Sequence, residues 1–456
     1  MENLSQKLSS FVSGLKYEDI PEEAVEYAKI LLVDYIASAA AGYRINTAFN
    51  RAMEEIYFGM GGSEESTVLF SNRKLPAMNA AMMHGVYVHG ADLDDGHRRA
   101  MGHPGCSVIS ALLALSEREK ASGKDFIVAM VAGYDVYIRT AAAIQPSHVN
   151  RGFHSSGTAG TIAAAAACAR LLNLDAEQTE NAMALAIIQA GGLILVNESG
   201  QACKPINPGK AAYSGMLAAL IAAQGIQSSK NALESTKGFF HAFADETDLS
   251  VFDSLGKHFS ILDCYIKPYP ACRHTHAGAD AALELRKQIS DVKDIDEIVV
   301  RIYPVAISLA GKIMTPSSVG EAKFSIAYAL CCAMVGGHFG LDDIIDPAHN
   351  DPEILALTKK VRIVSDQSME DPAKGTRGAF VEVRLKNGEV LQKEVPLPKG
   401  DPETAMDRKD ICEKLKWSAG DLLSEEQQLD ITEMLFSFEK QQDISGLFRY
   451  LIVRRN

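Results

Sequence analysis

The chain has 456 residues and a formal net charge of −13, and 47% of its residues are hydrophobic against 23% charged. This length accommodates two domains of ordinary size, or one large domain with a smaller companion. The composition is that of a folded globular protein rather than a disordered or fibrous one. Because no long basic stripe is present to neutralise phosphates, a nucleic-acid-binding role is not expected.

The cysteines and the apolar segments indicate in which cellular compartment the protein is expected. The eight cysteines include no CxxC pair and lie mostly in apolar runs, which favours a reduced protein. The first residues lack a basic start followed by an apolar segment, so no secretory signal is expected. The alanine-rich run 159–172 is too short and too poor in large apolar residues to span a bilayer. We therefore expect a cytoplasmic protein with no membrane role.

Helical patterns dominate from residue 3 to about 260. The first strong helix opens with Pro21 in its first turn and is expected to end at Gly42. Its apolar face is formed by Val25, Ala28, Leu32, Tyr35 and Ala39. Further helices are expected at about 76–89, 106–119, 124–146, 156–172, 177–195 and 208–225. Many of them are rich in alanine and glycine, which lets helices approach closely and predicts a compact helical domain.

A mixed pattern follows the segment CYIKPYPACRHTH. A helix at about 276–289 precedes the β-branched run DEIVVRIYPV, and a helix at about 319–336 precedes the strand-like KKVRIVSD. The segment AFVEVRLKNGEVLQKEV is typical of a hairpin that turns at Asn387 and Gly388. Helical patterns return in DRKDICEKLKWSAG and SEEQQLDITEMLFSFEKQ.

These patterns predict a mainly α fold with an inserted domain. A large all-helical domain is expected from residues 1–266 and 401–456, and a smaller α+β lid domain from residues 267–400. The cleft between two such domains is the first place to expect a binding site.

The segment HGADLDDGHRRAMGHPG, residues 89–105, concentrates ionisable groups just before an apolar helix. Its candidate functional residues are Asp92, Asp94, Asp95, His97 and His103. They could bind a metal, although no known ligand spacing is present. The carboxylates could instead only cap the next helix. The third interpretation is a metal-free acid/base site in which His103 exchanges a proton and a carboxylate orients it.

Two further polar segments precede apolar helices. In RGFHSSGTAG, His154, Ser155 and Ser156 could bind a carboxylate with the help of backbone N–H groups, or one of the serines could merely cap the helix. In SGQACKPINPGKAAYSG, Lys204 precedes a proline, where cation and backbone together could hold an anion. A solvated lysine is the alternative.

The segment IKPYPACRHTHAGADAALEL brings Lys267, Arg273, His274 and His276 close together, and its two prolines stiffen it. This concentration of basic groups before a helix favours anion binding. The chain has no glycine-rich phosphate loop and no dinucleotide fingerprint. Carboxylates are therefore the expected ligands.

The four segments, together with EAKFSIAYAL, resemble the signature segments of the MmgE/PrpD family, in order and over nearly the whole chain. That family includes 2-methylcitrate dehydratase, cis-aconitate decarboxylase and iminodisuccinate epimerase. The resemblance implies a helical domain formed by both chain ends, a smaller α+β lid, homodimers, and catalysis without metal or organic cofactor. It also implies active-site roles for Asp92, His103, His154, Lys204 and Lys267.

The chain departs from the family pattern at two places. Cys272 stands where the decarboxylase members carry a histidine thought to take part in proton transfer. The segment GHRRAMG differs from the decarboxylase pattern and adds His97, Arg98 and Arg99, which we interpret as residues that tune substrate choice.

The chemistry implied by the resemblance is proton removal or return at a carbon next to a carboxylate. Such a carbon acid is weak, so cations must stabilise an enediolate-like transition state, a role suited to Lys204, Lys267 and Arg273. His103 and His154 are the expected proton-transfer residues, with Asp92 orienting. The expected substrate contacts also include His97, Ser155 and His274.

The function expected first is that of a hydro-lyase on a 2-methylcitrate-like or citrate-like polycarboxylate. Epimerisation or decarboxylation of a related substrate, such as iminodisuccinate or cis-aconitate, is the alternative within the enzyme class. A non-catalytic homologue that binds a metabolite is the alternative outside it.

Overall fold

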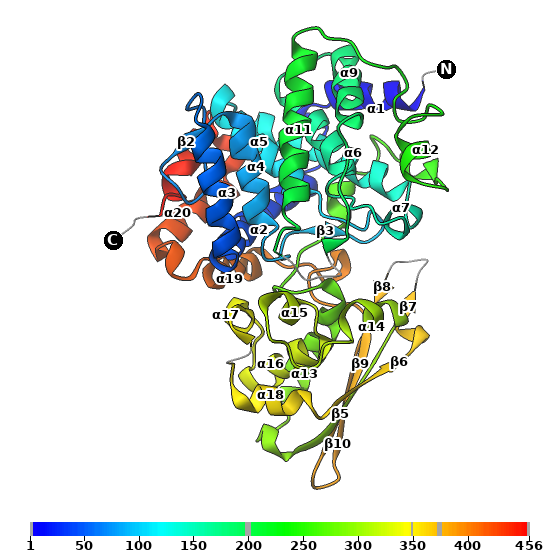
Figure 1. The fold of residues 1–456 in the computed structure, drawn as a ribbon, viewed down its shortest axis with the longest axis vertical. Helices are drawn as coiled ribbons and strands as arrows, with labels where there is room; N and C mark the ends of the chain where they lie inside the picture. Colours follow the sequence, from blue (N-terminus) through cyan, green and yellow to red (C-terminus); the bar gives the residue numbers. More distant parts are fainter. Residues whose placement is uncertain (1–2, 197–201, 348–349, 372–375, 454–456) are drawn as a thin grey trace. The chain divides into compact units, whose positions relative to one another are not determined.

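The computed structural model describes residues 3–196, 202–347, 350–371 and 376–453. The chain forms two compact units (Figure 1). The first contains the chain up to Gly90, Asp94–Tyr265 and the residues from Asp407 onward, and the second contains Ala91–Leu93 and Ile266–Met406. Helices predominate among the described residues, so the predicted mainly α fold is confirmed.

Helices make up most of the first unit. They are α1 (Leu4–Gly14), α2 (Glu22–Ile45), α3 (Thr47–Met60), α4 (Ala77–Val88), α5 (Gly105–Glu119), α6 (Gly123–Ala142), α7 (Ser147–Asn150), α8 (Ala159–Leu171), α9 (Ala176–Ile187), α11 (Ile206–Ala223), α12 (Phe239–Phe243), α19 (Arg408–Ala419) and α20 (Glu425–Phe436). The short strands β1 (Ser66–Thr67) and β2 (Lys74–Leu75) pair with each other, as do β3 (Gly96–His97) and β4 (Cys264–Tyr265).

Small residues allow the helices of this unit to pack closely. Helix α8 packs against α6 and α11, and α11 packs against α4. At the contact of α4 with α11, a Cβ on Gly85 would lie 2.6 Å from the Cα of Gly209. No side chain fits between the two backbones at that point, which explains why glycines occupy both positions.

Helix α2 extends beyond its expected end. The helix continues through Gly42 to Ile45, so the prediction that it ends at Gly42 is wrong. Gly42 instead permits a close approach to α4, since a Cβ there would lie 1.9 Å from the carbonyl oxygen of Tyr87. A buried ion pair between Asp34 of α2 and Lys414 of α19 joins the C-terminal helices to this helix.

Two other predicted helix boundaries are wrong near His154. The helix expected over 177–195 ends at Ile187, and the helix expected from 156 begins at Ala159. Gly192, with φ of +148°, lies in a conformation that side chains rarely adopt. Its carbonyl accepts a hydrogen bond from the backbone N–H of His154 at 3.0 Å, so this segment folds against the residues before α8 instead of continuing a helix.

The second unit combines helices with a four-stranded sheet. Its helices are α13 (His276–Arg286), α14 (Pro304–Ala310), α15 (Val319–Lys323), α16 (Ile326–Gly336), α17 (Leu341–Ile345) and α18 (Pro352–Thr358). Its strands are β5 (Ile295–Ile302), β6 (Val361–Ser365), β7 (Glu370–Asp371), β8 (Thr376–Arg377), β9 (Ala379–Leu385) and β10 (Val390–Val395).

The sheet has the order β10-β9-β5-β6, with β5 and β6 parallel and the other pairs antiparallel. The predicted hairpin is confirmed as β9 and β10, and Gly388 adopts the left-handed φ of +88° at the turn. The helix expected over 319–336 is two helices, because Ser325 interrupts it and caps α16 by accepting from the N–H of Tyr328.

None of the helices in the described ranges is long and apolar enough to cross a membrane. All eight cysteines are free thiols.

Candidate active site

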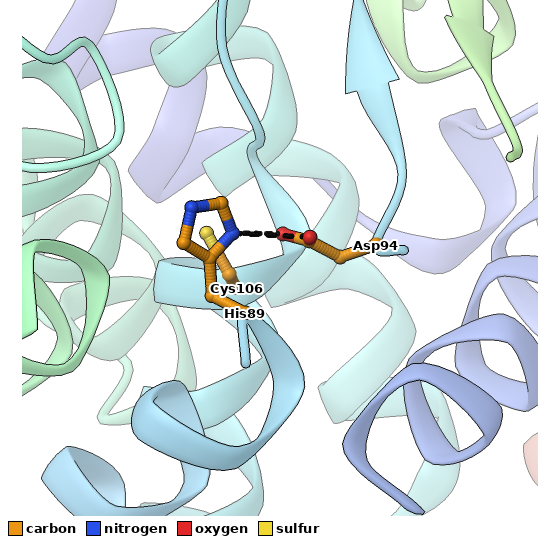
Figure 2. Close-up of side chains that lie close together, drawn as sticks. All are labelled: His89, Asp94 and Cys106. Atoms are coloured by element: carbon orange, nitrogen blue, oxygen red, sulfur yellow. Dashed lines mark hydrogen bonds and ion pairs between the residues drawn. The ribbon is translucent and has the colours of Figure 1, made fainter. Parts of the chain in front are cut away.

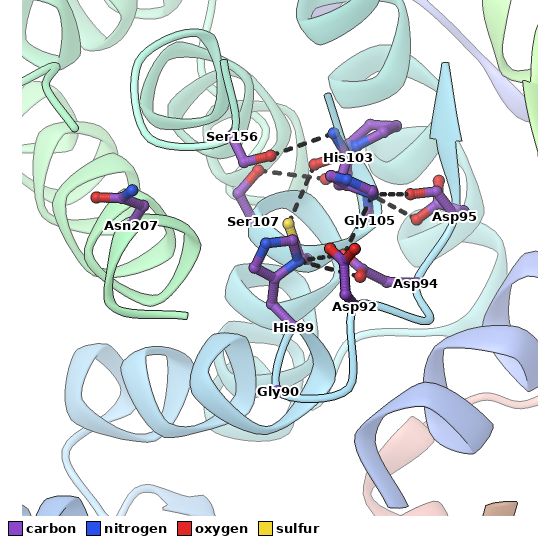
Figure 3. A network of polar contacts seen from close by, with 12 residues as sticks. His89, Gly90, Asp92, Asp94, Asp95, His103, Gly105, Ser107, Ser156 and Asn207 are labelled. Atoms are coloured by element: carbon purple, nitrogen blue, oxygen red, sulfur yellow. Dashed lines mark hydrogen bonds and ion pairs between the residues drawn. The ribbon is translucent and has the colours of Figure 1, made fainter. Parts of the chain in front are cut away.

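Three histidines from separate segments of the first unit gather into one cluster. Figure 3 shows two of them, His89 and His103, with the polar residues around them. His89 follows the last residue of α4, His103 lies in the turn before α5, and His154 lies just before α8. The ring of His89 lies 5.0 Å from the ring of His103 and 5.7 Å from that of His154. Their exposed fractions are only 1%, 9% and 4%, so water screens electrostatic interactions within the cluster weakly.

Asp94 supplies a carboxylate to this cluster. Its two oxygens lie 3.0 and 2.9 Å from Nδ1 of His89, and one of them lies 3.7 Å from Nδ1 of His103. Asp94 is 1% exposed. The carboxylate therefore accepts a hydrogen bond from His89 and stands close enough to stabilise positive charge on His103.

The hydrogen bond of His103 determines which ring nitrogen carries the proton. Nδ1 lies 2.7 Å from the backbone carbonyl oxygen of Asp95. A carbonyl oxygen can only accept, so Nδ1 carries the hydrogen and the basic lone pair of the neutral ring lies on Nε2. The backbone N–H of His103 donates to Oγ of Ser156 at 3.2 Å, which fixes this turn against the segment before α8.

His154 has the opposite arrangement. The side-chain nitrogen Nδ2 of Asn207 lies 3.0 Å from the carbonyl oxygen of Leu193, which assigns this atom of the amide as the donor. The same nitrogen lies 3.1 Å from Nδ1 of His154. Nδ1 of His154 therefore accepts, and the ring proton is on Nε2.

The side chain of Asp95 accepts a hydrogen bond at the start of α5. Its Oδ1 accepts from the N–H of Gly105 at 3.2 Å, at the first residue of α5. Burial, followed by the charges of Asp34 and Asp94, raises the pKa of Asp95 well above its ordinary value. The capping interpretation of this segment thus holds for Asp95, while Asp94 and His103 belong to the histidine cluster.

His97 and Ser155 make local hydrogen bonds. Nδ1 of His97 accepts from the N–H of Ala100 at 3.0 Å, and burial together with neighbouring arginines lowers the pKa of His97 to about 3. Oγ of Ser155 accepts from Gln145 at 2.8 Å. The residue that precedes α8 is Thr158, and neither Ser155 nor Ser156 caps this helix, so that alternative is wrong. Substrate contacts of His97 and Ser155 remain predictions.

His89, Asp94 and Cys106 bring together atoms of the types that bind metals, all within 4.8 Å of one another (Figure 2). The thiol of Cys106 donates to the carbonyl of His103 at 3.1 Å. Burial and the charges of Asp94 and Asp95 raise the pKa of this thiol well above its ordinary value. A metal would have to displace the proton of the thiol and that of His89 Nδ1, so the donor set fits a hydrogen-bonded cluster better. Metal independence remains a prediction.

In the second unit, Lys267 and Asp92 lie together. Nζ of Lys267 lies 2.5 Å from the backbone oxygen of Asp92 and 3.5 Å from its carboxylate, and the lysine is 1% exposed. Asp92 has a φ of +55°, in the left-handed region that a residue other than glycine seldom adopts. Such strain is concentrated at functional sites, which supports the prediction that this pair has a role.

The other basic residues of the segment 267–276 make contacts within the second unit. Arg273 donates to the Asp401 carboxylate at 2.6 Å and to the carbonyl oxygen of Lys399 at 2.9 Å. His274 shares a short hydrogen bond with the hydroxyl of Tyr303. Burial, followed by the charges of Arg377, Lys267 and Arg273, lowers the pKa of His274 well below its ordinary value, so this ring is neutral.

Cys272 and Lys204 occupy different settings. Cys272 is buried, and its backbone N–H donates to the carbonyl oxygen of Lys323 at 2.8 Å. Lys204 is half-buried in the turn before α11, next to residues 197–201, which lie outside the described ranges. Its role remains a prediction.

Sequence reasoning missed three residues near these groups. His89 begins the quoted segment, but no spacing rule distinguishes it from its neighbours. Asn207 lies in PINPG, where only the fold brings its amide to His154. Arg377 is the last residue of β8, and its charge acts on His274 although more than a hundred residues separate them in the sequence.

Buried imidazoles with defined proton positions beside one carboxylate are typical of enzymes that transfer protons. The MmgE/PrpD N-terminal domain matches residues 6–251, and the MmgE/PrpD C-terminal domain matches residues 269–439. The chain belongs to the MmgE/PrpD family, as the sequence predicts.

The similar curated proteins carry one kind of activity in their names. The cis-aconitate decarboxylase of Mus musculus is 27% identical over 99% of this chain and 94% of its own length. A cis-aconitate decarboxylase-like protein of Aspergillus oryzae is 27% identical over 98% of this chain and 96% of its own length. The cis-aconitate decarboxylase of Aspergillus terreus is 26% identical over the same shares. These relatives support an enzyme of the lyase class.

Proposed function

We propose that this protein is a hydro-lyase that removes water from a 2-methylcitrate-like or citrate-like hydroxy polycarboxylate, by proton transfer at a carbon next to a carboxylate. The observation that carries the proposal is the complementary protonation of His103 and His154. One ring presents a basic Nε2, and the other presents an Nε2–H donor.

His103 is the residue that moves the proton. Its Nε2 takes the hydrogen from the carbon next to a carboxylate, and the C–H electrons delocalise into that carboxylate as an enediolate. Asp94, 3.7 Å from Nδ1, stabilises the imidazolium that forms. The imidazolium then gives the proton to the hydroxyl on the adjacent carbon as the C–O bond breaks. A carbon–carbon double bond and water result, and His103 returns to its neutral form.

His154 acts as a neutral hydrogen-bond donor. Protonating its Nδ1 would set an N–H against the NH₂ group of Asn207, which itself donates to Leu193. The imidazolium form of His154 is therefore disfavoured. Its Nε2–H instead stabilises the oxyanion of the enediolate, as a preorganised donor does in the transition state.

Lys204, Lys267 and Arg273 are proposed to balance the charge of the polycarboxylate, as the family resemblance implies. Lys267 has the strongest support, because a buried ammonium paired with Asp92 is held in a defined position. Arg273 has the weakest support, because Asp401 and backbone carbonyls already engage its guanidinium. Asp92 is proposed to orient Lys267.

Decarboxylation of a cis-aconitate-like substrate is the second candidate, and the names of the relatives favour it. In that reaction CO₂ leaves, and a protonated His103 would protonate the remaining carbanion. Dehydration ranks first because the decarboxylase members that this chain resembles carry a histidine at the position of Cys272. A neutral thiol is a weaker proton donor than an imidazolium. Homodimerisation is also proposed from the family resemblance.

The test is product identification by NMR. The purified protein is incubated with 2-methylcitrate, citrate, cis-aconitate and chiral iminodisuccinate analogues, and the products are identified by ¹H and ¹³C NMR. Loss of the ¹³C signal of the hydroxyl-bearing carbon with the appearance of two olefinic ¹³C signals supports dehydration. Loss of one carboxylate indicates decarboxylation, and inversion at one carbon indicates epimerisation. Saturable binding of a polycarboxylate without any of these changes would favour the non-catalytic homologue.

A further inference from the structure

We propose that His89 is a positioning residue that holds Asp94 in place as the counter-charge of the His103 imidazolium. This inference rests on the proposed role of His103 and adds His89 to the residues expected from the sequence.

The first step is that Asp94 lies between two imidazoles. Both carboxylate oxygens lie within 3.0 Å of Nδ1 of His89, whereas the nearest approach to Nδ1 of His103 is 3.7 Å. The hydrogen bond from His89 is therefore the closer of these two contacts of the carboxylate. Nδ1 of His103 makes its own short bond to the carbonyl of Asp95, and Asp94 lies near enough to stabilise positive charge on this ring.

The second step is that His89 does not react itself. Its side chain is 0% exposed, so it does not reach a substrate in this conformation. Nε2 of His89 is buried and has no hydrogen-bond partner among the described residues. A second N–H at this position would be a buried donor without an acceptor among the described residues, which is costly. The Asp94 carboxylate bonds to Nδ1 of His89 and also faces His103.

The third step concerns the described titratable groups around Asp94, because burial favours the neutral form of each. These groups are Tyr35 of α2, Asp95 in the segment before α5, and Cys106 of α5. Burial raises the pKa of each above its ordinary value, which favours the neutral form of all three. Asp34, whose charge acts on Asp95, is ion-paired with Lys414. Asp94 thus carries the negative charge of the described cluster.

Two substitutions separate the proposed role from the alternatives. In His89→Asn the amide nitrogen lies near the former Nδ1 and can still donate to Asp94. In His89→Gln the longer side chain places the amide nearer the former Nε2, so the bond to Asp94 is lost. His84→Gln is the matched control. His84, on α4, is fully buried as His89 is, but it bonds to the carbonyl oxygen of Thr67, outside the cluster. Circular dichroism and melting curves establish that each variant folds.

The expected result is that His89→Asn retains kcat within about threefold of the unmodified protein, whereas His89→Gln loses on the order of tenfold or more. KM should change little in both, because His89 does not touch substrate. Weakening the counter-charge makes His103 a weaker base, so the acidic limb of the kcat/KM profile of His89→Gln should move to lower pH by about one unit. His84→Gln should change neither quantity.

Equal losses in the Asn and Gln variants, or an unmoved pH profile in His89→Gln, would overturn the inference. Histidine ¹⁵N NMR titration provides a readout that does not depend on activity. The titration midpoint of His103 should fall in His89→Gln and remain in His89→Asn. If the unmodified protein turns over no polycarboxylate, the proposed function fails, and an unchanged His103 midpoint would independently refute the role of His89.

Discussion

Replacing Asn207 with aspartate exchanges a hydrogen-bond donor for an acceptor beside His154. The amide nitrogen lies 3.1 Å from Nδ1 of His154 and holds the ring proton on Nε2. An aspartate at this position would accept from an Nδ1–H, so the neutral ring would move its proton from Nε2 to Nδ1. The donor proposed to stabilise the enediolate would then be lost while the imidazole itself remains.

The size of the effect follows from the role of that donor. Loss of one preorganised donor to a developing oxyanion costs about 2.7–4 kcal/mol, or about 10²–10³ in kcat. The fold loses the hydrogen bond from Asn207 to Leu193, worth about 0.5–1.5 kcal/mol, which is small against the roughly 5–15 kcal/mol that stabilises a folded protein. At lower pH a second proton returns to Nε2 of His154, so activity should partly recover.

The assay combines kinetics at pH 8 and pH 6 with histidine ¹⁵N NMR, which distinguishes the two tautomers. Asn150→Asp makes the same chemical change at an exposed residue of α7 and should leave kcat/KM unchanged. Full activity of Asn207→Asp at pH 8, with NMR confirming that the proton has moved to Nδ1, would refute the reasoning.

Activity should survive dialysis against EDTA, and restoration of lost turnover by a divalent ion would contradict the metal-free proposal. Lys204→Met and Lys267→Met should each weaken polycarboxylate binding by about 1.5–3 kcal/mol, seen as a raised inhibition constant for an unreactive tricarboxylate, with the fold intact; unchanged constants in both variants would remove these cations from the site. Cys272→His should raise the ratio of decarboxylation to dehydration products measured by NMR, and an unchanged ratio would show that this position does not select the reaction. Burial lowers the pKa of His84 in the folded protein to about 4. As the pH falls, this histidine therefore binds a proton in the unfolded protein before it does so in the folded protein. Stability should therefore decline between about pH 6.5 and 4. In urea unfolding the decline should be smaller in His84→Gln, and an equal decline would exclude His84 as its source.

Helix periodicity predicted the helical core well because the pattern of buried residues depends on local spacing. The face of α2 formed by Val25, Ala28, Leu32 and Tyr35 is buried as expected. The end of the same helix was missed because Gly42 permits a close contact between helices. A glycine that allows such a contact cannot be distinguished in the sequence from a glycine that ends a helix.

The sequence predicted which residues belong to the site, but not which nitrogen of each histidine ring carries the proton. The clustering of ionisable residues before two apolar helices indicated His103 and His154, and the structure brings both rings to His89. Proton positions depend on hydrogen bonds to the Asp95 carbonyl and to Asn207, which only the fold creates. No local pattern could have assigned them.

The segment after α9 illustrates the same limit. Its apolar spacing continues the helical pattern, and the helix nevertheless stops at Ile187. Tertiary hydrogen bonds from His154 to Gly192 and from Ile194 to Gly152 outweigh the local preference. The segment bonds to the backbone around His154 instead of continuing the helix. The helix prediction is therefore wrong at the place where the chain forms the candidate site.

The central claim is that His103 moves a proton at a carbon next to a carboxylate, and exchange with solvent deuterium tests it most directly. The protein is incubated in D₂O with 2-methylcitrate, citrate and cis-aconitate, and deuterium incorporation is followed by NMR. His241→Gln, at an exposed histidine of α12, serves as the control for His103→Gln. Our account predicts incorporation next to a carboxylate in the unmodified protein and in His241→Gln, and its loss in folded His103→Gln. Equal incorporation in His103→Gln, or none in any protein with any substrate, would contradict it.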